Sequence, residues 1–424
     1  MAPAGSDVSR AARRRRPLLL AGLLLAAFAV RVGYRLWQGE ADFWRDGYFF
    51  FYRMAENLVG GHGLWLAGRG WAVRQPAYPL FLALTAVGGP HFLLIVVCEA
   101  LFGVGACLCA FLIARRWFGV RAGLIAAALA AIYPYYVVHD TALQDTSMVD
   151  AGAALAVCAL LRARTSPSTA AWAAAGALDG LAVLIRGTLL PFALGAVVWT
   201  ALAGEGDIRR RLARAGVVFV VLAALLGAWA ARNYAHVGRF TLSTETGEEF
   251  WKANGPQTFN YYPAGSIDLS FAAALRAMSP ADRAALRAMH DDETARSDWF
   301  MARGFAYVRA HPGQTLVGAL RKEAAAFSWR LSPAKGLAAQ ALYAASYVPI
   351  LLLGLAGMAA TRRGWREHSL IYLQFAGFAL VTAVFWAHTS HRVYLDVYLM
   401  VFAAATLERA AGWLETRAFS RRRA

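Results

Sequence analysis

The sequence predicts an all-α polytopic membrane protein, and three observations support this prediction. Hydrophobic residues make up 59% of the 424 residues and charged residues only 16%, with a mean hydropathy of +0.43, a balance too apolar for a soluble domain. Apolar runs of spanning or near-spanning length recur along the chain. None of them alternates like a membrane β-strand, so helices must satisfy the backbone hydrogen bonds inside the lipid.

These runs predict about ten transmembrane helices, several of them short. They lie at residues 17–37, 91–114, 121–138, 147–162, 170–185, 188–203, 215–231, 339–360, 369–387 and 393–411. The basic residues 13–16 and the apolar run that follows them resemble a signal peptide. Because the run continues to Trp37, we expect an uncleaved first helix instead.

The arginines predict how these helices are oriented. They gather in alternate connections, for example at 115–116, 209–211 and 362–366, whereas the intervening short loops hold few. The positive-inside rule therefore predicts cytoplasmic N- and C-termini in a cell inner (plasma) membrane. The polar loop residues then lie on the extracytoplasmic face, where we expect the active site. The net charge of +17 resides largely in these arginine clusters, so no nucleic-acid partner is expected.

The chain divides into three parts by composition. Residues 1–231 form an N-terminal transmembrane half, whose first outer loop holds one amphipathic helix at about 42–59. Residues 232–338 are too polar to span and form an extracytoplasmic region with amphipathic helices. Residues 339–424 hold the last transmembrane helices and a basic cytoplasmic tail.

The extracytoplasmic region has its own signals. Ser279 followed by Pro280 predicts a helix start, and residues 312–331 predict a second amphipathic helix leading back to the bilayer. Residues 243–265 read as a loop dense in aromatics, amides and acids, including Glu245, Trp251, Lys252 and Asn254. Such side chains either line a sugar-binding cleft or cover an ordinary surface loop.

Several outer-face segments together resemble the GT-C membrane glycosyltransferases, especially the bacterial relatives of protein O-mannosyltransferases and of the lipid A aminoarabinose transferase. Each motif is weak alone, but their order and their placement on one face are specific to this superfamily. Two departures are Asp145, where a glutamate is usual, and Gly187, in place of proline. The segments are "AENLVGGHG" (55–63), "RQPAYPLFLAL" (74–84), "AIYPYYVVHDTALQDTSM" (131–148), "GLAVLIRGTLLPF" (180–192), "ARNYAHVGRFTLSTETGEEFWKANGP" (231–256) and "HTSHRVYLDVYL" (388–399).

The resemblance implies a GT-C-like helix bundle with amphipathic helices on its outer face. It also implies a polyprenyl-phosphate-linked sugar donor, attacked with inversion by a hydroxyl of a protein, lipid or glycan acceptor, with membrane lipids around the protein. Two other classes stay open. A transporter or flippase of lipid-linked saccharide would use the same lipid without a catalytic base, and a noncatalytic scaffold would use neither.

Two carboxylates are candidates for the chemistry of such a transfer. Asp46 is expected to be the general base, because burial at an interface tunes a carboxylate toward proton abstraction; Asp42 is a second candidate. Asp145 is expected to orient the acceptor, and its position before "TSM" also fits a helix N-cap. Asp46, Asp145, His139 or Asp140 could instead share a divalent ion, Mg or Mn, so no cofactor is certain and the metal is left open.

The leaving polyprenyl phosphate needs a partner of positive charge, and the planar fork of arginine suits it. Arg392, at the start of the last transmembrane helix, is the first candidate. Arg186 and His391 are weaker ones. Arg186 could also extend along the membrane surface, and His391 could simply mark a helix end. Lys252 and Asn254 complete the predicted substrate-binding residues.

Overall fold

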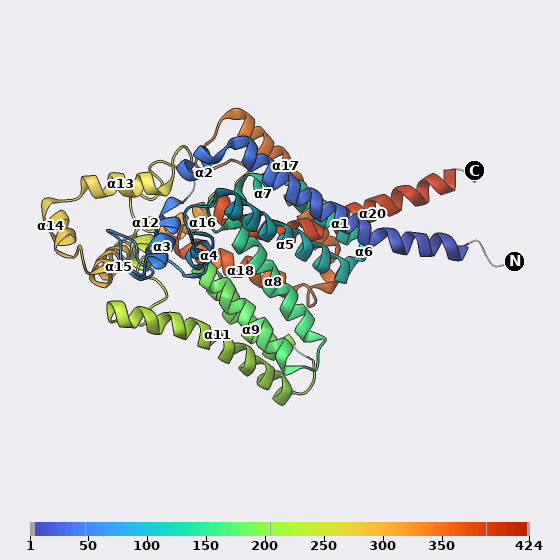
Figure 1. Cartoon of the computed structure of the whole chain (residues 1–424), viewed down its shortest axis with the longest axis horizontal. Coiled ribbons are helices and arrows are strands. Elements are labelled where there is room, and N and C mark those ends of the chain that lie inside the picture. Colours follow the sequence, from blue (N-terminus) through green and yellow to red (C-terminus); the bar gives the residue numbers. More distant parts are fainter. Residues whose placement is uncertain (1–4, 47, 204, 387, 422–424) are drawn as a thin grey trace.

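The computed structural model describes residues 5–46, 48–203, 205–386 and 388–421, with side chains for 16–45, 48–203, 205–386 and 388–416. Regular structure in this part of the chain is helical, apart from one isolated antiparallel bridge between Leu66 and Gly70. The all-α prediction is therefore confirmed. The start of α1 (Gly5–Gln38) and the end of α20 (Asp396–Arg421) lie at one end of the helix bundle, and the helices between Thr246 and Ala310 lie at the opposite end (Figure 1).

Among the described residues, six helices are long and apolar enough to cross a membrane. They are Arg16–Gln38 within α1 (Gly5–Gln38), α5 (Phe92–Phe118), α8 (Thr146–Arg164), α11 (Ile208–Val237), α17 (Leu337–Ala360), and the stretch Thr389–Thr416 that combines α19 (Thr389–Arg392), η3 (Val393–Leu395) and α20 (Asp396–Arg421). Four shorter apolar helices complete the predicted set: α6 (Val120–Ile132), α9 (Thr169–Ile185), η1 with α10 (Gly187–Leu189, Leu190–Ala203) and α18 (Ser369–Val384).

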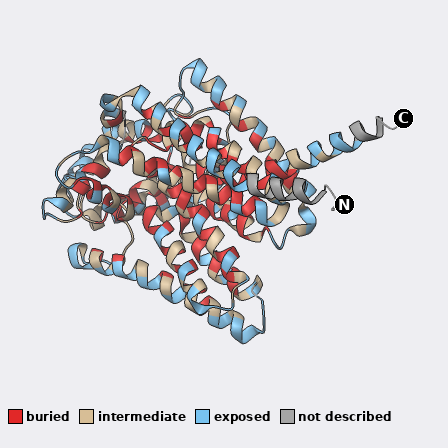
Figure 2. Cartoon of the chain, turned by 45° about the vertical axis from the view of Figure 1, so that its right-hand side comes forward, coloured by how far each residue is buried: buried red, intermediate tan, exposed pale blue. Residues whose placement is uncertain are grey.

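Small residues let these helices approach closely, as is common where no hydrophobic effect drives helices together in lipid. A Cβ at Gly357 of α17 would collide with the Phe402 carbonyl oxygen of α20, and one at Gly176 of α9 would lie 2.6 Å from the Val218 carbonyl oxygen of α11. Buried residues fill the middle of the bundle, whereas the outward faces of peripheral helices are exposed (Figure 2). Those exposed faces carry large apolar side chains such as Leu25, suited to contact with lipid.

The first outer loop corrects one prediction. Instead of one helix at 42–59, the chain forms α2 (Glu40–Asp46) and α3 (Phe49–Val59), followed by α4 (Ala77–Thr85). Gly47, between α2 and α3, lies outside the described residues; a glycine costs about 1 kcal/mol in a helix interior relative to alanine. The interruption lets Phe43 of α2 and Tyr52 of α3 enter the same buried cluster.

Five helices lie within residues 232–338, the region predicted to be extracytoplasmic: α12 (Thr246–Ala253), α13 (Ile267–Ala277), α14 (Pro280–Ala288), α15 (Glu293–Ala310) and α16 (Pro312–Ala326). The predicted start of α14 is confirmed, since the Ser279 hydroxyl accepts a hydrogen bond of 3.0 Å from the Asp282 amide. The prediction of a plain loop at 243–265 is wrong for α12. Lys252 lies one turn after Glu248 and Glu249 and pairs with both, which favours a helix there.

Gly357→Ala should lower the stability of the protein in detergent by roughly 1–3 kcal/mol, because the added methyl group has to push α17 and α20 apart. Gly227→Ala in α11 is the matched control, since a Cβ there meets nothing within 4 Å. Thermal unfolding of the two variants checks this. Equal unfolding temperatures would show that the α17–α20 contact is not tight.

Candidate active site

Polar side chains from several interhelical segments meet at the end of the bundle away from the termini. The backbone amide of Tyr48, before α3, donates to the carbonyl oxygen of Leu143 at 3.0 Å. The backbone amide of Thr244 likewise donates to the carbonyl oxygen of Ala72 at 2.8 Å. The side-chain amide of Asn254 donates to the carbonyl oxygen of Val384 at 2.7 Å. These bonds bring loops that are far apart in sequence into one polar layer.

The centre of this layer is an ion pair between Asp145 and Arg186. Arg186 follows the last residue of α9, and its Nε and Nη2 donate to the two carboxylate oxygens at 3.0 and 2.6 Å. Both side chains are largely buried, with exposed fractions of 17% and 12% for Arg186 and Asp145. Asp145 occupies the N-cap position of α8, but its carboxylate makes no capping bond there. The fork with Arg186 holds it instead, so the expected side-chain cap is wrong.

The third guanidinium nitrogen of Arg186 makes no hydrogen bond to Asp145. Arg186 Nη1 is buried and has no hydrogen-bond partner among the described residues. A buried donor without a partner costs about 1–3 kcal/mol, so such a group is favourably placed to bind an anion. Arg74 presents a second one: its Nη1 pairs with Glu245 at 3.0 Å, whereas its buried Nε has no described partner.

The backbone beside Asp145 is strained. Leu143 is fully buried at φ 49°, in the left-handed region that is unfavourable for a branched residue by about 1–2 kcal/mol. Its carbonyl oxygen is the one that accepts from Tyr48. Strain of this kind persists only where surrounding contacts enforce it, and it concentrates at functional sites.

Asp46, the predicted base, is the last residue of α2, and its side chain lies outside the described part of the chain. Its neighbourhood is described, because Tyr48 is bonded to Leu143, two residues before Asp145. Asp42, the second candidate, forms an exposed pair with Arg45 at 2.6 Å. The chain after α2 therefore runs beside the Asp145–Arg186 pair.

Arg392, the first candidate for binding the leaving phosphate, is enclosed by protein groups. It is fully buried, its Nε donates to the Ala326 carbonyl at 3.0 Å, and its Nη2 donates to the Tyr343 hydroxyl at 3.0 Å. Its Nη1 pairs with Asp396, one helical turn later. Each of its three nitrogens has a protein partner, so Arg392 holds α16, α17 and α20 together and is not open to a ligand in this structure.

The remaining predicted loop residues separate into two groups. Asp140 is buried against Arg31 of α1 at 2.6 Å, and His139 lies 3.0 Å from Gln144. Burial lowers the pKa of His139 to about 4, so it is neutral at pH 7. His391 instead lies within electrostatic reach of Arg186, with its ring 4.3 Å from that of His388. The pKa of His388 lies well below its usual range, mainly because the ring is buried and secondly because His391 lies nearby.

Lys252 belongs to a charged network on α12. Its Nζ lies 2.7 Å from Glu249, 3.2 Å from Glu248 and 3.4 Å from Asp268. Burial disfavours the ammonium, but these carboxylates outweigh it and raise the pKa of Lys252. Arg69 extends the network, since it lies 3.2 Å from Glu248 and 3.6 Å from Glu245, and Glu245 in turn pairs with Arg74 at 3.0 Å. The network thus joins α12 to the segment between α3 and α4.

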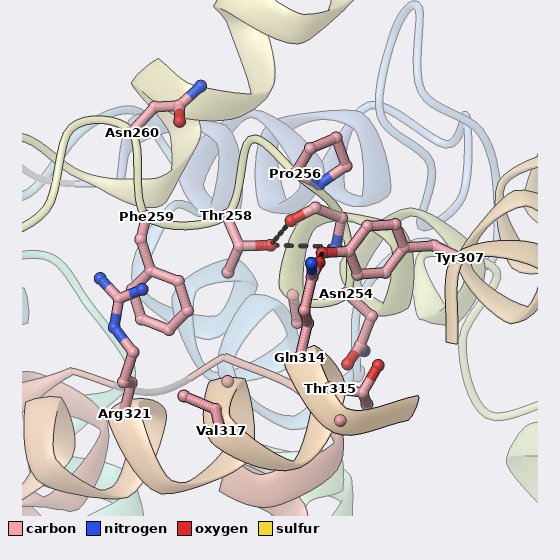
Figure 3. Close-up of a pocket in the computed structure, with 14 residues that line it drawn as sticks. Asn254, Pro256, Thr258, Phe259, Asn260, Tyr307, Gln314, Thr315, Val317 and Arg321 are labelled. Atoms are coloured by element: carbon pink, nitrogen blue, oxygen red, sulfur yellow. Dashed lines mark hydrogen bonds between the residues drawn. The ribbon is translucent and has the colours of Figure 1, made fainter. Parts of the chain in front are cut away.

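Asn254 borders a cavity of about 550 Å³ between α12 and α16 (Figure 3). Amide and hydroxyl groups line it, including Thr258, Asn260 and Gln314, together with Arg321, which lies 3.9 Å over the Phe259 ring. Amides combined with an aromatic face and a guanidinium suit a polyhydroxylated or peptide-like ligand.

The described residues do not form a metal site by themselves, because no group of three potential His, Cys, Asp or Glu ligands occurs among them. Asp145 is held by Arg186, and Asp140 by Arg31.

The sequence interpretation missed Tyr48 and Arg74. Arg74 stands in the segment "RQPAYPLFLAL", beside two prolines that fix the return of the chain to the bundle, so a signal was present. The same segment accounts for the small residue at position 187, where the resembling family has proline. A Cβ at Gly187 would lie 2.6 Å from Gln75 Nε2, so the Gln75 side chain occupies that space.

Comparison with known families gives a match for part of the sequence. The sequence profile of the family "Dolichyl-phosphate-mannose-protein mannosyltransferase" matches residues 74–230, which include Arg74, Asp145 and Arg186. No curated protein matches the sequence.

Solved structures extend the likeness to the whole fold. The archaeal oligosaccharyltransferase AglB from Archaeoglobus fulgidus, in complex with an inhibitory peptide and a dolichol-phosphate, aligns with 96% of this chain and 52% of its own (TM-score 0.59, 16% identity). Its apo form aligns with the same shares (TM-score 0.58, 18% identity). This chain thus spans about half the length of those proteins. ArnT from Cupriavidus metallidurans bound to undecaprenyl phosphate aligns with 93% of this chain and 78% of its own at a TM-score of 0.39 and 18% identity. The predicted GT-C-like fold is confirmed.

Lys322→Met should raise thermal stability at pH 7, by on the order of 1 kcal/mol. Lys322 is buried, with only two contacts of 3.4 Å, and burial lowers its pKa from 10.5 to about 8. The folded state therefore disfavours the ammonium; this penalty is complete below about pH 8 and fades as the pH rises from there toward 10.5. Unfolding temperatures between pH 7 and 10 should converge for the two proteins. The exposed Lys335→Met is the control, and a pH-independent difference would contradict the prediction.

Proposed function

We propose that this chain, which has the GT-C fold, is an integral membrane glycosyltransferase. It transfers a sugar from a polyprenyl-phosphate donor to an acceptor hydroxyl at the outer face of the inner membrane, with both termini in the cytoplasm. The main support is the buried Arg186, whose Nη1 has no described partner and which Asp145 holds in place. The family profile and the fold shared with AglB, a protein solved with dolichol-phosphate, support the same donor class.

Arg186 is the phosphate ligand in this proposal. Asp145 binds one edge of the guanidinium, through Nε and Nη2, and thereby fixes its plane, leaving Nη1 directed to a phosphate oxygen. Asp145 is then a positioning residue rather than one that contacts the acceptor. Arg74 Nε supplies a second donor, and Arg392 keeps a structural role because its nitrogens are occupied.

Asp46 is the general base in the transfer step. The acceptor hydroxyl oxygen attacks the anomeric carbon and loses its proton to the Asp46 carboxylate. The bond between that carbon and the phosphate oxygen breaks, and the polyprenyl phosphate leaves with the electron pair. Arg186 stabilises the negative charge that gathers on it. Attack opposite the leaving group inverts the anomeric centre.

The acceptor side is assigned to the extracytoplasmic helices. The cavity beside Asn254 offers amides, hydroxyls and the Arg321–Phe259 stack, which suit a glycan or a peptide segment that carries the hydroxyl. Lys252 stabilises α12, which forms one wall of this region, through its three carboxylate contacts.

Asp46→Asn should reduce transfer by at least about 100-fold while the donor still binds, because an amide cannot accept the proton. The assay measures sugar release from a panel of radiolabelled polyprenyl-phosphate sugars by the purified protein in lipid nanodiscs, at two divalent-metal concentrations. Asp42→Asn is the matched control and should retain activity, since Asp42 forms only an exposed pair. If no donor turns over, or if Asp46→Asn equals wild type, the transporter interpretation takes precedence.

Arg186→Lys should lower kcat by about tenfold or more and weaken donor binding, because a lysine keeps the charge but cannot both hold Asp145 and reach the phosphate. Arg239→Lys is the control, since Arg239 forms the same two-pronged contact with Asp298 on an exposed surface (2.8 and 2.6 Å). Single-turnover and steady-state kinetics separate the two effects. Unchanged kinetics for Arg186→Lys would reject Arg186 as the phosphate ligand.

A further inference from the structure

A second pocket lies at the opposite end of the bundle, near the two termini of the chain. Its volume is about 1010 Å³, and the ends of α5, α17 and α18 form it together with α20 and η2 (Arg362–Gly364). Four arginines line it: Arg116, Arg362, Arg363 and Arg409.

The charge of this pocket is strongly positive. Its one acidic lining residue, Glu367, is already paired through both carboxylate oxygens with Arg164, at 3.0 and 3.1 Å. The N-terminus of the 16-residue α18, whose N-cap His368 makes no side-chain capping bond, adds the positive end of a helix dipole. A topology signal alone requires arginines at this end, but it does not require them to surround one pocket.

Two buried nitrogens in the pocket wall lack partners. His368 is 4% exposed and lines the pocket, and its Nδ1 has no hydrogen-bond partner among the described residues. The indole Nε1 of Trp117 is also buried and unpartnered within the described part of the chain. The two rings pack against each other with centroids 4.7 Å apart. Buried polar groups are normally satisfied, so these nitrogens indicate a ligand whose oxygens accept from Trp117 Nε1 and from the His368 tautomer that carries its proton on Nδ1.

The position of the pocket decides between a lipid and a soluble ligand. Helices that are long and apolar enough to span the membrane end around it. Trp365, next to the lining residue Gly364, and Trp413, one turn after the lining residue Arg409 on α20, are 55% and 53% exposed, as is usual at a membrane–water interface. Basic pockets between helix ends at this level bind anionic lipid headgroups.

We propose that this pocket binds the phosphate headgroup of an anionic phospholipid. The arginines neutralise the phosphodiester, and Trp117 Nε1 and His368 Nδ1 bind its oxygens. The acyl chains extend along the neighbouring helices into the bilayer. This site is separate from the Asp145–Arg186 pair, and its test does not depend on transferase activity.

The test measures binding of dioleoyl phosphatidylglycerol to purified protein in detergent by native mass spectrometry, with dioleoyl phosphatidylcholine as the neutral lipid. Wild type should bind the anionic lipid at least tenfold more tightly. Trp117→Phe removes the indole N–H but keeps a packed ring, and it should weaken binding by about tenfold. The double variant R363Q/R409Q should abolish the preference for the anionic lipid.

The matched control is R209Q/R210Q at the exposed start of α11, which removes the same charge from the same end of the bundle. Thermal unfolding in neutral detergent verifies that each variant is folded. Three outcomes would overturn the proposal: equal loss of binding in the control, no effect of Trp117→Phe in a folded protein, or binding of sn-glycerol 3-phosphate as tight as that of the lipid.

Discussion

The ion pair between Asp145 and Arg186 is the interaction on which the polar end of this molecule depends. It joins the start of α8 to the end of α9 at the level where both helices leave the apolar layer. Removing one partner of such a buried pair typically costs 3–5 kcal/mol, because the other charge is left uncompensated. The pair therefore fixes the two loops that the first outer loop contacts through Tyr48 and Gln75.

A membrane protein has two polar ends with different tasks, and the charges of this chain reflect that difference. At one end, acids and bases are interlocked: Lys252 with three carboxylates, Glu245 with Arg74, and Arg186 with Asp145. At the other end, arginines largely face open space and surround one pocket. In the proposed function the interlocked end positions groups for chemistry on an anion, and in the proposed lipid site the arginine-rich end binds a charged headgroup.

The sequence predicted the helices, but it did not show which arginines already have protein partners. Apolar runs have no alternative in lipid but to form helices, so the predicted transmembrane set agrees with the observed one. Outer segments are not under that constraint, which is why the break after Asp46 and the helix α12 escaped the prediction. The sequence analysis placed Arg392 before Arg186 as the ligand of the leaving phosphate. That choice depends on which guanidinium already has protein partners. The spacing of Arg392 and Asp396 by four residues was a visible sign of pairing, but the free nitrogen of Arg186 emerges only from three-dimensional contacts.

Gly187 illustrates how a departure from a family pattern can be balanced within one molecule. The space that a larger residue would fill there belongs to Gln75, from a segment more than a hundred positions away in the chain. The two positions therefore compete for one space. A proline at 187 would require a shorter side chain at 75, and a substitution at only one of the two would displace the loop that supports Arg186.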